Sequence, residues 1–166
     1  TQLNYKIACT YMNEANWESA IKNLEIAMRI HRMQPEYNLA MGQCYMELDK
    51  LDDAITYFGN VVRVRPKNIN GWTELLKCLY KAEMLEDALE YAGFAFEQTD
   101  GKPIFLFYKS AVLYAMGKSK EALLNLEAGM NRNPKLIKKF IEINPSILQV
   151  QQVVDLIARY KKRKSL

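Results

Sequence analysis

The side chains that most often do chemistry are few in this sequence, and their spacing is irregular. His31 is the only histidine, and the three cysteines, Cys9, Cys44 and Cys78, form no CxxC pair. The odd cysteine count argues against a disulfide framework, and the missing CxxC pair argues against a zinc site. The glycine-rich phosphate-binding motifs GxGxxG and GxxxxGKS/T are also missing. We therefore expect no metal, nucleotide or other cofactor.

The paired carboxylates have a structural interpretation. Asp52-Asp53 and Glu86-Asp87 stand where two helices are expected to begin, and negative charge there favours the helix dipole. A catalytic triad can assemble from residues far apart in the sequence. Each serine and cysteine here nevertheless has a structural alternative, so we predict that the chain is not an enzyme.

Net charge and hydrophobicity limit the classes of partner and the cellular compartment that we expect for this chain. The net charge of this 166-residue chain is +4, and the run from Lys161 to Lys164 accounts for all of it. The neutral remainder lacks a broad basic face for a phosphate backbone, so we expect no specific nucleic acid. We interpret the basic run as a solvated helix end. No apolar run is long enough to span a membrane, and the free thiols and missing leader favour the cytoplasm.

A repeat of 34 residues organises most of the chain. Ala20, Ala54, Ala88 and Ala122 are spaced by 34 residues, and each begins an apolar pattern with helical periodicity. Prolines at or just beyond the ends of the blocks mark boundaries that a helix does not cross. Each block therefore predicts two antiparallel helices. The expected blocks are 1–34, 35–68, 69–102 and 103–134.

The blocks predict an all-α fold. A single helix pair cannot bury its apolar face alone, so four pairs are expected to stack into a right-handed α-solenoid. After Pro134 the period ends, and residues 135–166 are predicted to form two capping helices with a basic tail. The first is expected near 136–143, and the second from Pro145 onwards. No polar cap precedes Tyr5, which predicts further sequence upstream of Thr1.

The blocks resemble the tetratricopeptide-repeat family, of the kind found in bacterial repeat proteins. The matching residues of the second block are Gly42, Tyr45, Ala54, Phe58 and Pro66, and the third block supplies Trp72 and Leu75. The resemblance covers residues 1–134. It implies a non-catalytic module for protein–protein interaction, in which the first helix of each pair lines a concave groove that binds peptides.

The groove positions that this resemblance implies are rich in aromatic and methionine residues, which are typical of contact surfaces. The predicted peptide-binding residues are Tyr5, Met12, Leu39, Gln43, Met46, Glu47, Lys77, Tyr80, Lys81, Phe107 and Tyr114. A helical or extended segment with apolar anchors fits this lining. We expect Tyr80→Ala or Phe107→Ala to weaken binding and to leave folding nearly intact.

Family members that bind chaperone tails use a clamp of Lys, Asn and Arg side chains. Its positions are occupied here by Tyr5, Cys9, Gln43, Thr73 and Lys77. One lysine cannot hold two carboxylates, so a chaperone adaptor is disfavoured.

Three alternatives to peptide binding remain. The N-terminal face could be covered by a second copy of the chain, which predicts self-assembly. The array could be the docking arm of a larger upstream protein. Binding of RNA by a helical repeat is the least favoured of these, because the body of the chain is neutral. The identity of the protein partner does not follow from the residues.

Overall fold

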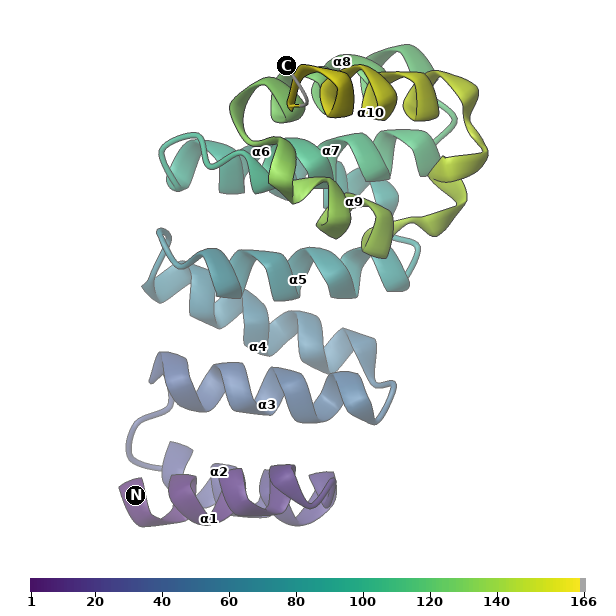
Figure 1. The fold of residues 1–166 in the computed structure, drawn as a ribbon. Coiled ribbons are helices and arrows are strands. Elements are labelled where there is room, and N and C mark those ends of the chain that lie inside the picture. The colour runs from purple at the N-terminus through teal and green to yellow at the C-terminus, as the bar shows by residue number, and fades with distance from the viewer. Residues whose placement is uncertain (165–166) are drawn as a thin grey trace. The chain divides into compact units, whose positions relative to one another are not determined.

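The computed structural model describes residues 1–164, and every regular element in that range is a helix, as the all-α prediction requires. The chain divides into two compact units, Thr1–Glu83 (unit 1) and the part from Met84 onwards (unit 2). Unit 1 contains α1 (Gln2–Asn13), α2 (Trp17–Met28), α3 (Pro35–Glu47), α4 (Leu51–Val64) and α5 (Ile69–Lys81) (Figure 1). Unit 2 contains α6 (Leu85–Gln98), α7 (Ile104–Ala115), α8 (Ser119–Arg132), the 3-10 turn Pro134–Leu136, α9 (Ile137–Ile143), the 3-10 turn Pro145–Gln149 and α10 (Gln151–Lys164).

The turns inside the expected pairs share one backbone conformation. Ala15, Asp49 and Glu83 have positive φ angles of 56°, 59° and 59°, and Gly117 has 78°. These four positions are 34 residues apart. The N–H of the next residue donates back to the preceding helix, from Asn16 to the Tyr11 carbonyl at 2.8 Å. Such left-handed residues end a helix and reverse the chain.

The periodic alanines lie where the helices approach each other most closely. Ala20 and Ala54 in unit 1, and Ala88 and Ala122 in unit 2, are completely buried. In unit 1, α3 also approaches α4 at Gly42, where a Cβ atom would lie 2.5–2.8 Å from the Phe58 ring. Small side chains thus allow tight helix packing at a fixed position of each repeat. The boundary between the units falls inside the third expected block.

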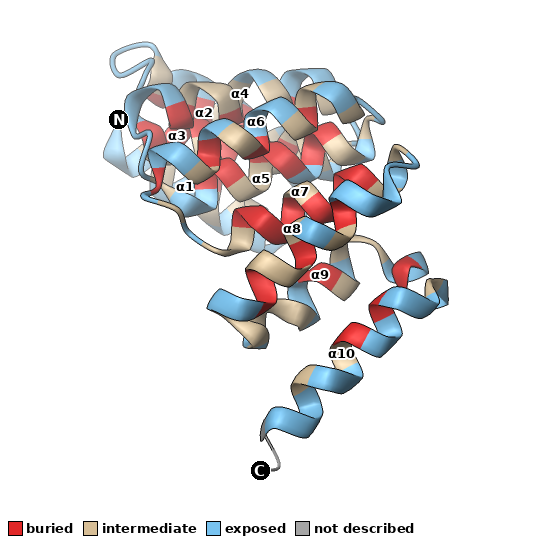
Figure 2. Cartoon of the chain, turned by 90° about the horizontal axis from the view of Figure 1, so that it is seen from above, coloured by how far each residue is buried: buried red, intermediate tan, exposed pale blue. Residues whose placement is uncertain are grey.

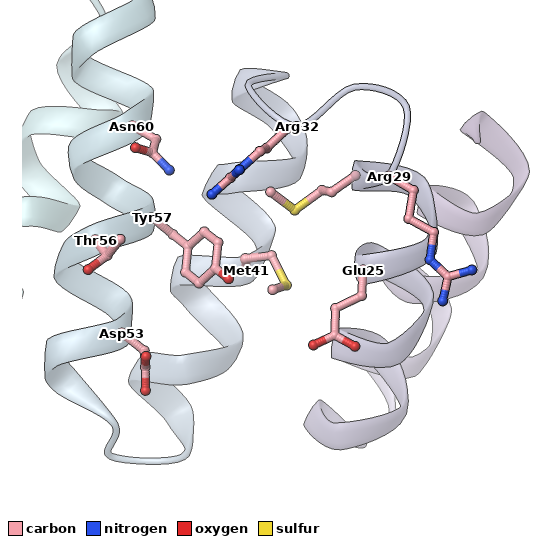
Figure 3. A pocket seen from close by; sticks show the side chains of 9 residues that line it. Glu25, Arg29, Arg32, Met41, Asp53, Thr56, Tyr57 and Asn60 are labelled. Atoms are coloured by element: carbon pink, nitrogen blue, oxygen red, sulfur yellow. The ribbon is translucent and has the colours of Figure 1, made fainter.

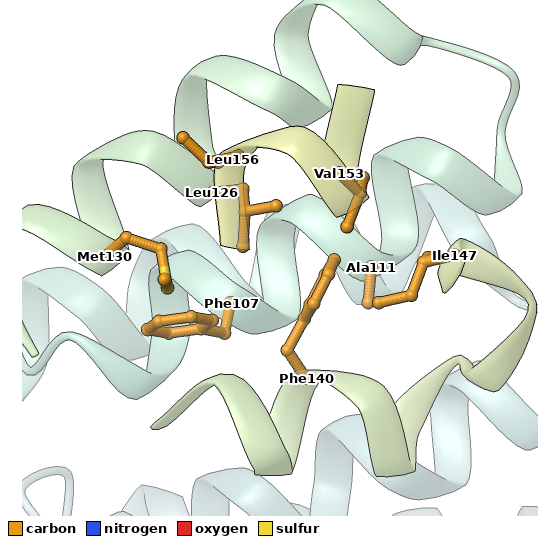
Figure 4. Packing of buried hydrophobic residues seen from close by; sticks show 8 residues of the cluster. All are labelled: Phe107, Ala111, Leu126, Met130, Phe140, Ile147, Val153 and Leu156. Carbon is orange, nitrogen blue, oxygen red and sulfur yellow. The ribbon is translucent and has the colours of Figure 1, made fainter. Parts of the chain in front are cut away.

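The core of unit 2 is completed by the segment after the repeats. Phe140 of α9, Ile147 and two residues of α10 join Phe107 and Leu126 in one buried cluster, shown in Figure 4. The rest of α10 is largely exposed (Figure 2), as expected for a terminal cap. The last two residues of the predicted capping segment, 165–166, lie outside the described residues.

The second capping helix begins later than the sequence predicts. A 3-10 turn, Pro145–Gln149, is followed by Val150 in an extended conformation, and α10 begins at Gln151. Ile147 and Val153 are both buried in the same cluster. In one continuous helix they would point about 120° apart, since each residue turns the helix by about 100°. The break at Val150 lets both side chains reach the core.

Candidate functional site

The predicted contact residues of unit 1 lie on the first helix of each pair. α1 and α3 contact each other, and α3 and α5 both pack against α4. The half-buried members of the set are Tyr5, Met12, Leu39, Gln43, Met46 and Tyr80. The exposed members are Glu47, Lys77 and Lys81. We call these nine residues the first-helix face of unit 1.

The tyrosines of the first-helix face remain protonated near neutral pH. Burial and the neighbouring Cys9 raise the pKa of Tyr5 to about 12. Burial also raises the pKa of Tyr80 above its ordinary value. The Tyr5 ring packs against Tyr37, with 5.1 Å between the ring centroids. The face therefore offers aromatic surface with neutral hydroxyl groups.

The two lysines of this face already have carboxylate partners. The Nζ atom of Lys81 is 3.5 Å from Oδ1 of Asp49, and that of Lys77 is 3.4 Å from Oε1 of Glu74. Both lysine side chains are about half exposed, so these pairs contribute little to stability. The arrangement differs from a clamp, in which several free Lys, Asn and Arg side chains would hold two ligand carboxylates.

The two predicted contact residues of unit 2 are covered by the chain itself. Phe107 is completely buried, with its ring centroid 6.1 Å from that of Phe140 in α9. A Cβ atom on Gly129 of α8 would lie 2.8 Å from the Phe107 ring, so α8 also packs closely against this ring. The expectation that Phe107 lines an open groove is therefore wrong. The same burial contradicts the expectation that Phe107→Ala leaves folding nearly intact.

Tyr114 is also part of this contact. Its ring centroid is 6.4 Å from that of Phe140, and its hydroxyl is buried without a hydrogen-bond partner among the described residues. The prediction failed for α7 because residues 137–143 were expected only to close the end of the array. α9 instead packs across α7 and contributes to the same core (Figure 4).

A pocket that no sequence pattern indicated lies between α2 and α4. It has a volume of about 330 Å³ and is lined by Glu25, Met28, Arg29, Arg32, Met41, Asp53, Thr56, Tyr57 and Asn60. The Tyr57 side chain extends toward Met41, with Arg32 and Asn60 toward one end and Glu25 and Asp53 toward the other (Figure 3). No short motif could have revealed this pocket, because its walls come from several helices of two different repeats.

The described residues contain neither a metal-binding cluster nor a membrane-spanning helix. No group of three or more His, Cys, Asp or Glu side chains in residues 1–164 is placed to hold a metal ion. No helix in that range is both long and apolar enough to cross a bilayer. The three thiols are free, and Cys44 and Cys78 are buried.

Comparisons with known proteins agree with the second block of the repeat. A family model described as tetratricopeptide repeat matches residues 35–68, which are the residues of that block. This match covers one repeat and supports the resemblance of the chain to the tetratricopeptide-repeat family. A search of curated proteins finds no match to the sequence.

Solved structures extend the similarity of fold over nearly the full length of the chain. One crystal structure of MamA aligns with a TM-score of 0.76 and 14% identity, covering 99% of this chain and 93% of that chain. MamA from Desulfovibrio magneticus RS-1, solved from residue 41 to its end, aligns with a TM-score of 0.73 and 15% identity, covering 99% and 94%. These similarities confirm the predicted α-solenoid fold class. The family and fold support, in general terms, a module for protein–protein interaction.

Proposed function

We propose that this chain is a non-catalytic interaction module that binds an apolar segment of a partner protein on the first-helix face of unit 1. One observation carries the proposal. Phe107 lies two repeats after Leu39, and Tyr114 lies two repeats after Met46. In unit 2 both side chains pack against Phe140 of the chain's own α9, and Phe107 is completely buried, whereas its equivalent Leu39 remains half-buried.

This difference indicates the chemistry of the partner. The α7 face is covered by a short helix that contributes a large aromatic side chain. The first-helix face of unit 1 offers the same kind of surface, with aromatic and thioether side chains and the amide of Gln43. A helical or extended segment with one or two large apolar anchors suits it. Glu47 and the paired lysines then contribute to orientation more than to affinity.

Site-specific photo-crosslinking tests the proposal. Benzoylphenylalanine in place of Met46 is expected to trap a partner segment from native cell extract, with large apolar residues at the crosslink found by mass spectrometry. The matched control places the same group at Leu124, which is 66% exposed on α8. Equal trapping at both positions, or trapping at Leu124 alone, would contradict the proposal.

Alanine substitutions provide a second test with a matched control. Tyr80→Ala is expected to weaken partner capture, because it removes an aromatic contact from the face. Tyr91→Ala removes the same kind of side chain from an exposed position on α6 and is expected to leave capture unchanged. Circular dichroism establishes that both variants fold. Loss of capture in both variants would point to a non-specific hydrophobic contact.

Self-association through the open side of α1 is a second candidate function. Leu3 and Ile7 lie one helical turn apart and are 69% and 37% exposed. The corresponding residues of the next repeat, Tyr37 and Met41, are only 7% and 1% exposed. The face of α1 is thus an apolar surface of the kind that buries contacts between repeats. Light scattering of wild type and Leu3→Glu at increasing concentration tests this candidate, which predicts a mass increase only for wild type.

We also propose a cytoplasmic location. Its support is chemical: the chain holds three free cysteines, which persist best in a reducing compartment. Fractionation of native cells with an antibody against the chain tests it, and recovery in an oxidising compartment would overturn it.

A further inference from the structure

A pocket in unit 2 combines an apolar interior with a cationic rim. It has a volume of about 390 Å³ and is formed by the end of α8, the turn Pro134–Leu136, the start of α9 and the last turns of α10. Its lining residues are Met130, Pro134, Lys135, Ile137, Lys138, Ile157, Tyr160 and Lys161. We call it the lysine-rimmed pocket. It lies in the other unit from the first-helix face and does not depend on the function proposed above.

The interior of the pocket is apolar and well anchored. Met130 belongs to the buried cluster of unit 2, and Ile137 and Ile157 pack against that cluster. The hydroxyl of Tyr160 donates a hydrogen bond to Oδ1 of Asn131. The Arg163 guanidinium lies over the Tyr160 ring, 5.1 Å from its centroid. These contacts hold Tyr160 as one wall of the pocket.

The rim carries positive charge on both walls. Lys135 and Lys138 come from the turn and α9, whereas Lys161 comes from α10 on the other wall. All three residues are exposed, and none of them forms an ion pair within residues 1–164. No aspartate or glutamate lines the pocket. Its surroundings are basic as well, since residues 132–164 contain nine Lys or Arg but only two Asp or Glu.

We propose that the lysine-rimmed pocket binds an acidic peptide segment, in which a large apolar side chain enters the pocket and Asp or Glu residues on both sides of it contact the rim lysines. An amphiphile with a single anionic head would neutralise one wall and leave the other unpaired. A peptide with carboxylates on both sides of its anchor matches both walls. Charge complementarity of this kind also speeds association, and it weakens as salt is added.

A labelled peptide tests the proposal on the full chain. The probe is a fluorescein-labelled hexapeptide with Leu-Phe at its centre and two Glu residues on each side, and its binding is measured by fluorescence anisotropy. The dissociation constant is expected to rise with ionic strength. A second peptide with Gln in place of Glu, and a third with Ala-Ala in place of Leu-Phe, are each expected to bind much more weakly. Equal binding of all three peptides would overturn the proposal.

Two double variants locate the binding. Lys138→Gln with Lys161→Gln is expected to raise the dissociation constant of the acidic peptide by about fivefold or more. Lys118→Gln with Lys120→Gln removes the same charge from exposed positions at the beginning of α8 and is expected to leave it nearly unchanged. Because all four lysines are exposed, both variants are expected to fold. Equal weakening in the two variants would show general charge attraction and overturn the assignment to the pocket.

A membrane surface is the competing occupant. Sedimentation with vesicles of phosphatidylcholine and phosphatidylserine in equal parts separates it from a peptide. The proposal predicts that the peptide binds and that vesicles do not compete for it. Vesicle binding that depends on Lys138 and Lys161, without peptide binding, would overturn the peptide assignment.

Discussion

The ring centroid of Phe140 lies 6.1 Å from that of Phe107, and both side chains are completely buried. A helix of seven residues, α9, thereby covers the face of α7. The corresponding positions of α3 in unit 1 remain half-buried. This contrast supports the proposed placement of the partner on the first-helix face of unit 1 rather than on α7.

The contact between these two rings predicts the stability of unit 2. Phe140→Ala is expected to lower the free energy of unfolding by about 3 to 5 kcal/mol, because it leaves a cavity beside Phe107 and Tyr114. Both tryptophans, Trp17 and Trp72, lie in unit 1, so their fluorescence reports on unit 1 and circular dichroism is needed for unit 2. Urea titrations followed by both signals measure the change.

The matched control for this prediction is Leu124→Ala, which truncates a side chain that is 66% exposed on α8. It is expected to change the free energy of unfolding by less than about 0.5 kcal/mol. A Phe140→Ala variant as stable as this control would mean that α9 is not docked on α7 in solution.

The repeated turn offers a way to raise stability. Ala15 has a φ angle of 56°, a left-handed conformation that glycine adopts more easily than alanine. Ala15→Gly is expected to stabilise unit 1 by about 0.5 to 1 kcal/mol, since relief of the left-handed strain exceeds the added entropy of the unfolded chain. Tryptophan fluorescence in urea measures it.

The reverse substitution at the equivalent turn of unit 2 is Gly117→Ala. It is expected to destabilise by about 1 kcal/mol, because open space surrounds Gly117 and only its φ angle of 78° opposes a side chain. A change of the same sign in both variants would rule out backbone strain as the cause.

Substitution by alanine at two glycines of unit 1 is expected to change the free energy of unfolding in opposite directions. A Cβ atom on Gly42 would lie 2.5–2.8 Å from the Phe58 ring, so Gly42→Ala must move α3 away from α4. We expect a loss of about 1 to 3 kcal/mol in the free energy of unfolding. Nothing lies within 4 Å of a Cβ on Gly59, in the interior of α4. Gly59→Ala is therefore expected to stabilise by about 0.5 to 1 kcal/mol.

Both variants are measured by tryptophan fluorescence in urea. If Gly42→Ala proves as stable as wild type, the close approach of α3 and α4 is not present in solution.

The buried thiols predict a loss of stability at alkaline pH. Burial raises the pKa of the Cys78 thiol from 9.0 to about 12, and that of Cys44 to about 11. Above pH 9.0 these thiols ionise in the unfolded chain while they stay protonated in the folded chain. Their stabilising contribution is therefore complete below pH 9.0 and is lost as the pH rises through about 11 to 12. Urea titrations between about pH 8 and pH 10.5 follow the decline.

Cys78→Ala isolates the contribution of one thiol. The variant is expected to be less stable than wild type at neutral pH, because the side chain is completely buried. Its stability should nevertheless fall less steeply with pH. An unchanged slope would assign the alkaline loss to other groups, with Tyr5, whose pKa is raised to about 12, as the next candidate.

The repeat in the sequence predicted the helices well because it reflects local geometry. Ala20, Ala54, Ala88 and Ala122 recur at one position of each block, and all four are buried. Helical spacing of apolar residues and the boundary role of proline act over a few residues, so they can be read without knowing the fold. The exception is the segment after Pro145, where two buried side chains require a break that local spacing does not reveal.

The composition of the first helices also suggested candidate contact residues, but not their exposure. Tyr5, Leu39 and Phe107 occupy one repeat position, and the sequence assigns all three to the same face. Only the tertiary structure shows that Phe107 is covered by α9, while Tyr5 and Leu39 remain half-buried. The two pockets could likewise not be predicted from the sequence, because each is lined by residues from several helices. Periodicity determines which side of a helix is apolar, whereas burial depends on which distant segment packs against it.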